Sequence, residues 1–337
     1  MKKEFEQLVE NLARELSEEN IDSSRVENLA LRLNDRSGYG QKKETKNNLM
    51  NKLGYDTKDD RLSSSLQTIT ESIQYLRMLG IKEVSKVVAD FPPILSLTVE
   101  DTLRPKVEYL MSIGVKQEDI GKVVTKHPQV LSFSIDNTMK QRVEYLKSIG
   151  VKHEDIGKVV TDLPQVLSYS IDDNMKQRIE YLKSIGVKQE DIGKVVTKHP
   201  PILTLSVDDV MKQRVDYLSS IGFKQEDIGK IVTRYPQVLA LDIDNNLKPT
   251  YEFLRKNFRT TIRQITNTPV FLGCSLNKRI KPRYEFLKQK KPGKKYSAGY
   301  VLKISDEKFC KRFGINPQEY QDFKQKYITE NKKWYVK

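Results

Sequence analysis

Lysine and arginine side chains recur at a fixed interval along the middle of this 337-residue chain. The recurring cations are Arg104 and Lys106, Lys140 and Arg142, Lys176 and Arg178, Lys212 and Arg214, and then Lys248. A regular row of cations can follow a phosphate backbone, because each contact releases condensed counterions and strengthens binding at low salt. We therefore predict that these residues bind nucleic acid, and that their contacts position the protein without selecting a base sequence.

A second row of cations stands two residues before regularly spaced prolines. It consists of Lys126, Lys198 and Arg234, and Asp162 interrupts it in the middle segment. We predict a phosphate-binding role for these three as well. The alternative for any single lysine is a solvated ion pair with an acid on an adjacent helix. For the arginines near the predicted core we favour phosphate contact, because a planar guanidinium suits phosphate geometry better than an ammonium.

Positive charge is densest at the C-terminal end of the chain. Residues 278–337 contain 18 lysines and arginines against six acids, whereas residues 75–277 contain 29 against 25. Lys278, Arg279, Lys281 and Arg283 fall within six residues and complete the predicted nucleic-acid-binding set. Five more lysines occupy residues 288–295, around a predicted turn at Pro292–Gly293. Aromatic residues interleave with these charges, and we expect the rings inside and the cations outside; they are Tyr296, Tyr300, Phe309, Phe313 and Trp334.

Patterns typical of catalysis are missing from the sequence. There is no GxxxxGK[ST] loop, no HExxH zinc motif and no GxSxG nucleophile motif. Cys274 and Cys310 give no CxxC spacing and the three histidines are far apart, so we predict no metal, no cofactor and no enzymatic activity. His127 and His199 are expected to pack or cap. Repeated tyrosines could stack on flipped bases, but their place beside a core leucine favours a half-buried structural role; they are Tyr109, Tyr145, Tyr181 and Tyr217.

A repeated structural element must position these side chains. Prolines recur with a step of 36 residues at Pro92, Pro128, Pro164, Pro200 and Pro236, and glycines recur with the same step at Gly114, Gly150, Gly186 and Gly222. Self-similarity at a constant period indicates a solenoid, in which each unit buries its apolar side by stacking on its neighbours. We predict an all-α superhelical α-solenoid, right-handed or left-handed, with a concave face for a rod-like ligand.

Each 36-residue unit is predicted to form two helices and a short third turn. Asp136 is the predicted N-cap of one first helix, and Gly150 ends that helix by adopting the left-handed conformation. Glu154 and Asp155 open the second helix, where negative charge complements the helix dipole. Pro164 stops it, because proline lacks an N–H and disfavours helix in the residue before it. The apolar segment after the proline is predicted to form a single packed turn.

The repeat array is predicted to span residues 66–290, between a helical extension with a polar linker at 1–65 and a basic C-terminal cap at 291–337. Apolar residues at helical spacing around Leu8 and Leu29 predict helices in the extension. The extension or the cap could bind a protein partner. No run of 18 apolar residues occurs, so no membrane partner is expected. The acidic start fits neither a secretory signal nor an Arg-rich transit peptide, which leaves the compartment open.

The repeated text PQVLSxSIDxxxKxRxEYLxSIGVxxEDIGKVV resembles the repeat of the mitochondrial transcription termination factor (mTERF) family. The stretch FLGCSLNKRIKPRYEFL (Phe271–Leu287) is similar to that family's characteristic C-terminal unit, and SAGYVLKISDEKFCKRFG (Ser297–Gly314) is similar to its ending. The resemblance covers about residues 66–325. It implies a half-doughnut of helix, helix and 3₁₀ turn that holds double-stranded DNA, or structured RNA, along a positive concave path in mitochondria or chloroplasts.

Three functions are compatible with these observations. The first is a double-stranded DNA-binding factor that regulates transcription, for example its termination, in organellar gene expression. The second is a structured-RNA-binding factor in ribosome assembly, and the third is a protein-interaction scaffold, as helical solenoids often are. A nucleic-acid binder should show a steep dependence of affinity on salt, whereas binding by a scaffold should depend on salt only weakly.

Overall fold

The computed structural model describes the chain from Asp60 to Asn331, with side chains from Gln67 onward. The helices predicted around Leu8 and Leu29 lie outside the described residues, as does Trp334. From Asp60 to Asn331 every regular element is a helix, which confirms the predicted all-α repeat fold. In this same range, no helix combines the length and hydropathy that a membrane span requires.

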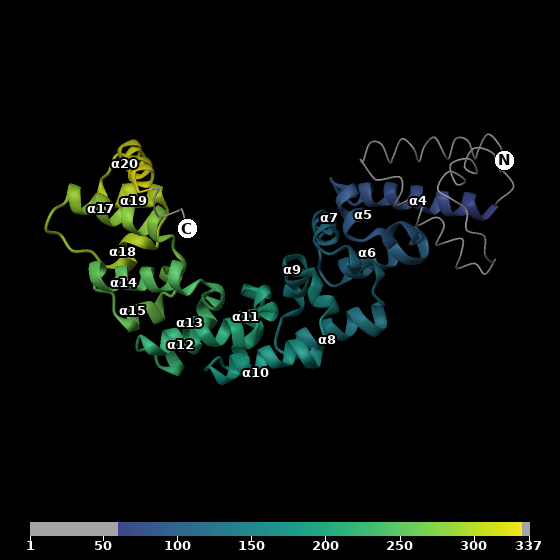
Figure 1. Cartoon of the computed structure of the whole chain (residues 1–337), viewed down its shortest axis with the longest axis horizontal. Coiled ribbons are helices and arrows are strands. Elements are labelled where there is room, and N and C mark those ends of the chain that lie inside the picture. The colour runs from purple at the N-terminus through teal and green to yellow at the C-terminus, as the bar shows by residue number, and fades with distance from the viewer. Residues whose placement is uncertain (1–59, 332–337) are drawn as a thin grey trace. The chain divides into compact units, whose positions relative to one another are not determined.

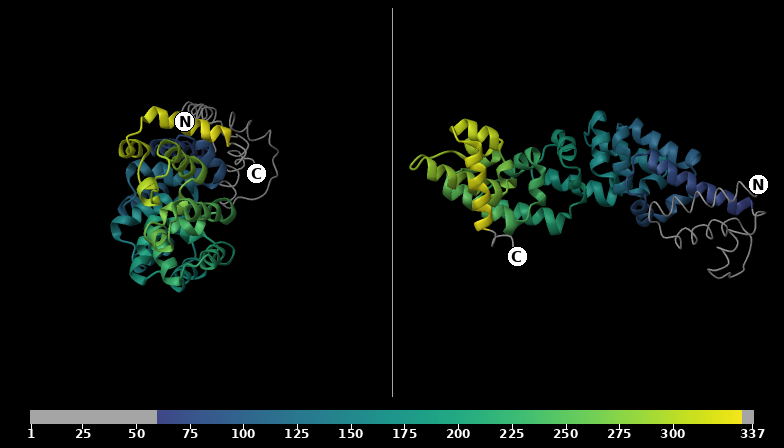
Figure 2. Two further views of the ribbon diagram at one scale, coloured as in Figure 1. Left: turned by 90° about the vertical axis from the view of Figure 1, so that its left-hand side faces the viewer. Right: turned by 90° about the horizontal axis from the view of Figure 1, so that it is seen from above.

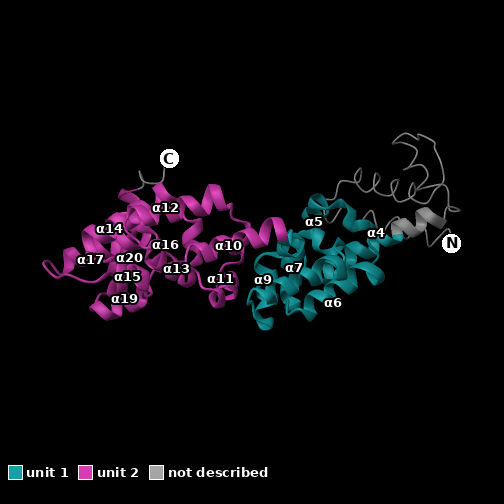
Figure 3. Ribbon diagram, turned by 90° about the horizontal axis from the view of Figure 1, so that it is seen from below, with its two compact units in different colours: residues 1–171 teal, residues 172–337 magenta. Residues whose placement is uncertain are grey.

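The chain divides into two compact units, residues 1–171 and residues 172–337 (Figure 3). The first helices of successive repeats are α4 (Asp60–Met78), α6 (Arg104–Ser112), α8 (Gln141–Ser148), α10 (Gln177–Ser184), α12 (Gln213–Ser220), α14 (Lys248–Phe258) and α17 (Lys281–Lys290). The second helices are α5 (Val84–Asp90), α7 (Gln117–Lys126), α9 (His153–Asp162), α11 (Ile192–Lys198), α13 (Gln225–Arg234), α15 (Ile262–Asn267) and α18 (Ala298–Leu302). Helix α4 begins six residues before the predicted start of the array.

The predicted third turn of each repeat is a 3₁₀ helix that begins at the repeated proline. These turns are η1 (Pro92–Ser96), η3 (Pro128–Ser132), η5 (Pro164–Ser168), η8 (Pro200–Thr204) and η10 (Pro236–Ala240). After α15, the short helix α16 (Val270–Gly273) takes the same place. Helix α11 is preceded by one further 3₁₀ turn, η7 (Gln189–Asp191).

The end of each first helix follows from its glycine. Gly150 has a φ of +93°, a conformation that only glycine adopts at little cost. Its N–H donates to Lys147 O at 2.9 Å, and the next N–H, of Val151, donates to Leu146 O at 3.0 Å. This pair of bonds satisfies two carbonyls that the helix end would leave open. The predicted glycine stop is confirmed, and so is the proline stop, because α9 ends at Asp162 before Pro164.

The predicted N-cap at Asp136 is wrong. Ser134 is the cap, since its Oγ accepts from the N–H of Asn137 at 3.1 Å, while Asp136 pairs with Lys140. A π-helical turn follows, with the N–H of Met139 donating to Ser134 O at 3.0 Å, and it runs directly into α8. The equivalent π-helical turns are η2 (Val99–Leu103), η4 (Ile135–Lys140), η6 (Ile171–Lys176), η9 (Val207–Lys212), η11 (Ile243–Leu247) and η12 (Leu276–Ile280).

Second helices pack on second helices of the next repeat. In unit 1, α7 contacts α5 and α9; in unit 2, α13 contacts α11 and α15 (Figure 1). A glycine in the second helix allows the backbone of that helix to pack directly against the backbone at the end of the first helix of the preceding repeat. A Cβ atom added to Gly157 would lie 1.9 Å from Gly114 O, and one added to Gly229 would lie 2.0 Å from Gly186 O. No other residue fits there without moving a helix, because real Cβ contacts never come this close.

The C-terminal helices close unit 2 over an aromatic core. Helices α19 (Asp306–Phe313) and α20 (Pro317–Glu330), yellow-green and yellow in Figure 2, follow α18, and α20 packs on both α17 and α19. The buried cluster joins Leu254 of α14 and Phe286 of α17 to Phe309, Phe313 and Tyr320. The predicted cap therefore shares one core with the last repeats. The expectation of rings inside holds for Phe309 and Phe313, whereas Tyr300 is 46% exposed.

Replacing Gly229 with alanine should destabilise unit 2. The added Cβ would collide with main-chain atoms of Gly186, and overpacking of this kind costs about 1–3 kcal/mol. Urea unfolding followed by circular dichroism measures the loss. Gly299→Ala is the matched control, because its Cβ would meet only Phe271 Cζ at 3.9 Å and helix propensity alone favours alanine. Equal stabilisation by both substitutions would contradict the close backbone contact.

Candidate nucleic-acid interface

Three of the predicted arginines link one repeat to the next. Arg142, Arg178 and Arg214 are half-buried at the starts of α8, α10 and α12, and each donates from Nε to a main-chain carbonyl 27 residues ahead. The acceptors are Tyr169 O at 3.1 Å, Leu205 O at 3.1 Å and Leu241 O at 3.0 Å. Each arginine also donates from Nη1 to the carbonyl four residues back. These guanidinium groups therefore hold the segment after the next 3₁₀ turn against their own helix.

Lys106 occupies the position that Arg142 holds in the following repeat. Its side chain is half-buried and makes no hydrogen bond or ion pair, and burial lowers its pKa. At the far end of the array the same position is Thr250, which is buried. The hydrogen bond to the next repeat therefore forms where this position holds an arginine, and it does not form where the position holds Lys106 or Thr250.

The cations of the second row cap helices of the following repeat. Lys126 Nζ donates to Thr161 O at 3.1 Å and Asp162 O at 3.2 Å, at the end of α9. Lys198 Nζ bonds in the same way to the end of α13, and Arg234 Nη1 to Thr266 O at the end of α15. Positive charge at a helix C-terminus is favourable and satisfies its open carbonyls. Contact of this row with nucleic acid stays a prediction.

Four other predicted cations form exposed ion pairs along the first helices. Lys140, Lys176 and Lys212 each pair with the aspartate four residues earlier, at 2.6, 2.5 and 2.5 Å. Arg104 pairs with Glu100 at 2.7 Å and also lies over the Tyr75 ring. About half of each cationic side chain is exposed, and pairs of this kind contribute little to stability. A phosphate could therefore replace the carboxylate, but each acid cancels the charge of its own cation.

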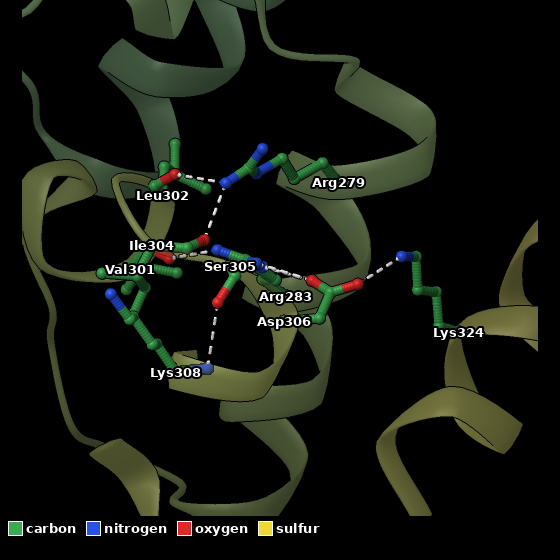
Figure 4. Close-up of polar contacts among 9 residues, drawn as sticks. All are labelled: Arg279, Arg283, Val301, Leu302, Ile304, Ser305, Asp306, Lys308 and Lys324. Atoms are coloured by element: carbon green, nitrogen blue, oxygen red, sulfur yellow. Dashed lines mark hydrogen bonds and ion pairs between the residues drawn. The ribbon is translucent and has the colours of Figure 1, made fainter. Parts of the chain in front are cut away.

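The four clustered cations of the C-terminal unit separate into two classes, and Figure 4 shows the two arginines. Arg279 Nη2 donates to Leu302 O at 3.1 Å and Ile304 O at 2.7 Å, and Arg283 is only 1% exposed. Arg283 is not available to an outside phosphate, and we leave it out of the proposed interface. Lys278 is exposed and Lys281 is half-buried, with its pKa lowered by burial.

Arg283 is the centre of an ion-pair network that joins three helices. Its Nη2 lies 2.6 Å from Asp306 Oδ1, its Nη1 donates to Val301 O at 2.7 Å, and its guanidinium carbon lies 4.8 Å from the Phe309 ring centre. Lys324 Nζ of α20 binds the other oxygen of Asp306 at 2.6 Å. Burial alone raises the pKa of Asp306, but the hydrogen bonds from Lys324 and Arg283 more than offset it and hold that pKa below its usual value of 3.8.

Exposed lysines without partners gather in the last repeats of the described chain. Residues 248–311 contain 17 lysines and arginines against four acids. Besides Lys256, six exposed lysine side chains here make no hydrogen bond or ion pair, namely Lys248, Lys294, Lys295, Lys303, Lys308 and Lys311. Lys308 extends away from the network around Asp306 (Figure 4). Among single candidates the sequence analysis named only Lys248 of these six, although the excess of cations after residue 278 was a signal for the others.

The remaining candidate side chains take structural positions. His127 and His199 are half-buried, burial lowers their pKa values, and His127 packs on the Phe133 ring at 5.6 Å between centres. Burial raises the pKa of both Tyr181 and Tyr217 to about 12, which agrees with their expected half-buried place. Between Asp60 and Asn331, no three His, Cys, Asp or Glu side chains gather as a metal site would require.

The model of the mTERF family matches residues 62–310 of the chain. This range begins within α4 and ends within α19, so it contains all the repeats described above. No curated protein matches the chain.

Asp306→Asn should destabilise unit 2 by about 3 kcal/mol at neutral pH, because it leaves the buried Arg283 without its main counter-charge. The loss should shrink on acidification. A carboxyl whose pKa is lowered by folding contributes stability above its unfolded value, here 3.8, and loses it as the pH falls through the folded value. Urea unfolding of both proteins between pH 7 and pH 3 measures this. A constant difference across that range would contradict a charged Asp306 as the stabilising partner.

Proposed function

Because this chain belongs to the mTERF family, we propose that it binds double-stranded DNA through the cations of residues 248–311 and thereby regulates transcription, for example its termination. Membership of the family implies nucleic-acid binding by helical repeats and a role in organellar gene expression. The family is not one of enzymes. The choice of DNA as the ligand and of termination as the process is the proposal.

One observation carries the proposal: the last repeats hold exposed cations that no acid neutralises. In the central repeats Lys140, Lys176 and Lys212 face aspartates, so their surface is close to neutral. Asp244 stands four residues before Lys248 but forms no ion pair with it, and from there to Lys311 the corresponding acids are largely missing. Unpaired lysines attract a polyanion without first breaking an ion pair, and their charge steers association from a distance.

The proposed interface has the six unpaired lysines at its centre. Lys278 and Lys281 extend it on the same segment, and the paired cations of the first helices, including Arg104, are weaker candidates for phosphate contact. Lysine contacts reach phosphates and not base edges, so this interface supplies affinity with little sequence readout. Selection of a site would then need DNA shape or other residues.

Full-length protein should bind duplex DNA with an affinity that falls steeply with salt. Six lysine–phosphate contacts correspond to a slope of about −5 in log K against log salt concentration. Fluorescence anisotropy with a duplex, a structured RNA of equal length and their single strands, each across a salt series, measures this. Tighter binding of the RNA would favour ribosome assembly over transcription. Weak binding of every probe with no salt dependence would overturn the proposal in favour of a protein scaffold.

Removing the charges of Lys303, Lys308 and Lys311 together, each by substitution with glutamine, should lower the salt slope for duplex DNA by about 2–3. The matched control replaces Lys140, Lys176 and Lys212 with glutamine, which removes the same charge from lysines that already face aspartates. We expect a smaller change in the control. Equal effects of the two triple variants would place the interface along the whole array and not at its C-terminal end.

A further inference from the structure

The turn between α14 and α15 departs from the turn of every preceding repeat. In the preceding repeat, Gly222 ends α12, Lys224 follows, and Glu226 with Asp227 opens α13. The repeats of Gly114, Gly150 and Gly186 have the same arrangement, and after Gly80 a lysine is followed by the single acid Glu83. In the turn after α14, Arg259 stands at the left-handed position, and the first turn of α15 contains no acid.

Arg259 has a φ of +52° and is the single non-glycine residue between Asp60 and Asn331 with a positive φ. Glycine holds this conformation in the other repeats, for example Gly222 with a φ of +98°. An L-residue adopts it against a steric penalty from its Cβ atom. Strain of this kind is retained where the side chain has a use, which makes Arg259 a candidate for function.

Three cations of this turn are free of partners. Lys256, Arg259 and Arg263 are exposed, and their side chains make no hydrogen bond or ion pair within the described residues. A fourth cation, Arg255, donates from Nη1 to Thr260 O at 3.2 Å and so spans the turn. The chain contains no acid between Glu252 and Glu285. The turn thus presents a strongly positive surface, and residues 253–284 contain no acid that could neutralise it.

The backbone that carries these cations is fixed. Thr260 N–H donates to Leu254 O at 3.2 Å, and Thr261 with Gln264 forms a reciprocal capping box at the start of α15. The turn also lies beside the preceding one, since a Cβ atom on Gly222 would be 3.3 Å from Ile262 Cδ1. Three unpaired cations within eight residues of an ordered turn are pre-organised for an anion, because little backbone entropy is lost on binding.

We propose that Lys256, Arg259 and Arg263 form a phosphate clamp for the nucleic-acid backbone. The clamp is a second contact point, in addition to the lysines of residues 294–311. This inference rests on the proposed function and adds a particular site to it. Guanidinium groups suit the role because they bind two phosphate oxygens in parallel. The clamp positions the backbone and is indifferent to base sequence.

The test restores the residue of the other repeats. Arg259→Gly combined with Arg263→Gln, in the full chain, removes two cations and relieves the left-handed strain. Binding to duplex DNA should weaken roughly tenfold at 150 mM salt, with a salt slope lower by about two. The melting temperature should equal or exceed that of the unchanged protein, because neither side chain has a partner to lose. A purely structural Arg259 would instead give a lower melting temperature and unchanged binding.

Lys188→Gln combined with Lys194→Gln is the matched control. It removes the same charge around the corresponding turn of an earlier repeat, where Glu190 and Asp191 remain, and we expect little change in affinity. Salt-dependent binding by the unchanged protein together with wild-type affinity of the Arg259/Arg263 variant would overturn the clamp and leave the proposed function standing. Failure of the unchanged protein to bind duplex DNA at any salt concentration would overturn both.

Discussion

The close approach of two backbones from successive repeats is the constraint on which the rest of the structure depends. Gly157 in unit 1 and Gly229 in unit 2 lie so near a preceding glycine carbonyl that a Cβ atom would sit about 2 Å from it. The second helix is therefore held directly against the C-terminal turn of the first helix of the preceding repeat, at the packing density of a protein interior. In unit 1 the contact recurs with the 36-residue step, since a Cβ atom on Gly121 would lie 2.6 Å from Leu79 O, and equivalent side chains there have equivalent surroundings.

This regularity explains how the central repeats use their cations. Main-chain carbonyls stay open at each helix end and after each 3₁₀ turn, and a buried open carbonyl is costly. Arg142, Arg178 and Arg214 reach such a carbonyl in the next repeat, and Lys126 and Lys198 reach the end of the next second helix. Cations that the spacing alone would assign to a ligand thus hold the repeats together. The same spacing is what a phosphate-binding row would show, so period alone does not separate the two roles.

Local features of the sequence were predicted well, and features that depend on a distant partner were not. Gly150, Pro164 and the acidic pair at the start of α9 act within a few residues, and all were located correctly. The cap at Ser134 was missed because a π-helical turn, which no propensity indicates, starts the helix earlier. The burial of Arg283 depends on Asp306 and Lys324, 23 residues and 41 residues further along the chain. A charged side chain beside prolines and lysines gives no sign of such partners.

Departure from the repeat is therefore the better guide to function than the repeat itself. Where the period is exact, most cations have an acid or a carbonyl within reach, and the surface is nearly neutral. From Lys248 onward, where the repeat is less regular, acids become few while the cations remain. There Arg259 takes the positive-φ position that glycine holds in the other repeats. Selection for stability alone would have kept the glycine and the acidic pair, since both favour the fold. A polyanionic ligand accounts for the loss of both the glycine and the acidic pair, because it supplies the negative charge that the turn no longer contains.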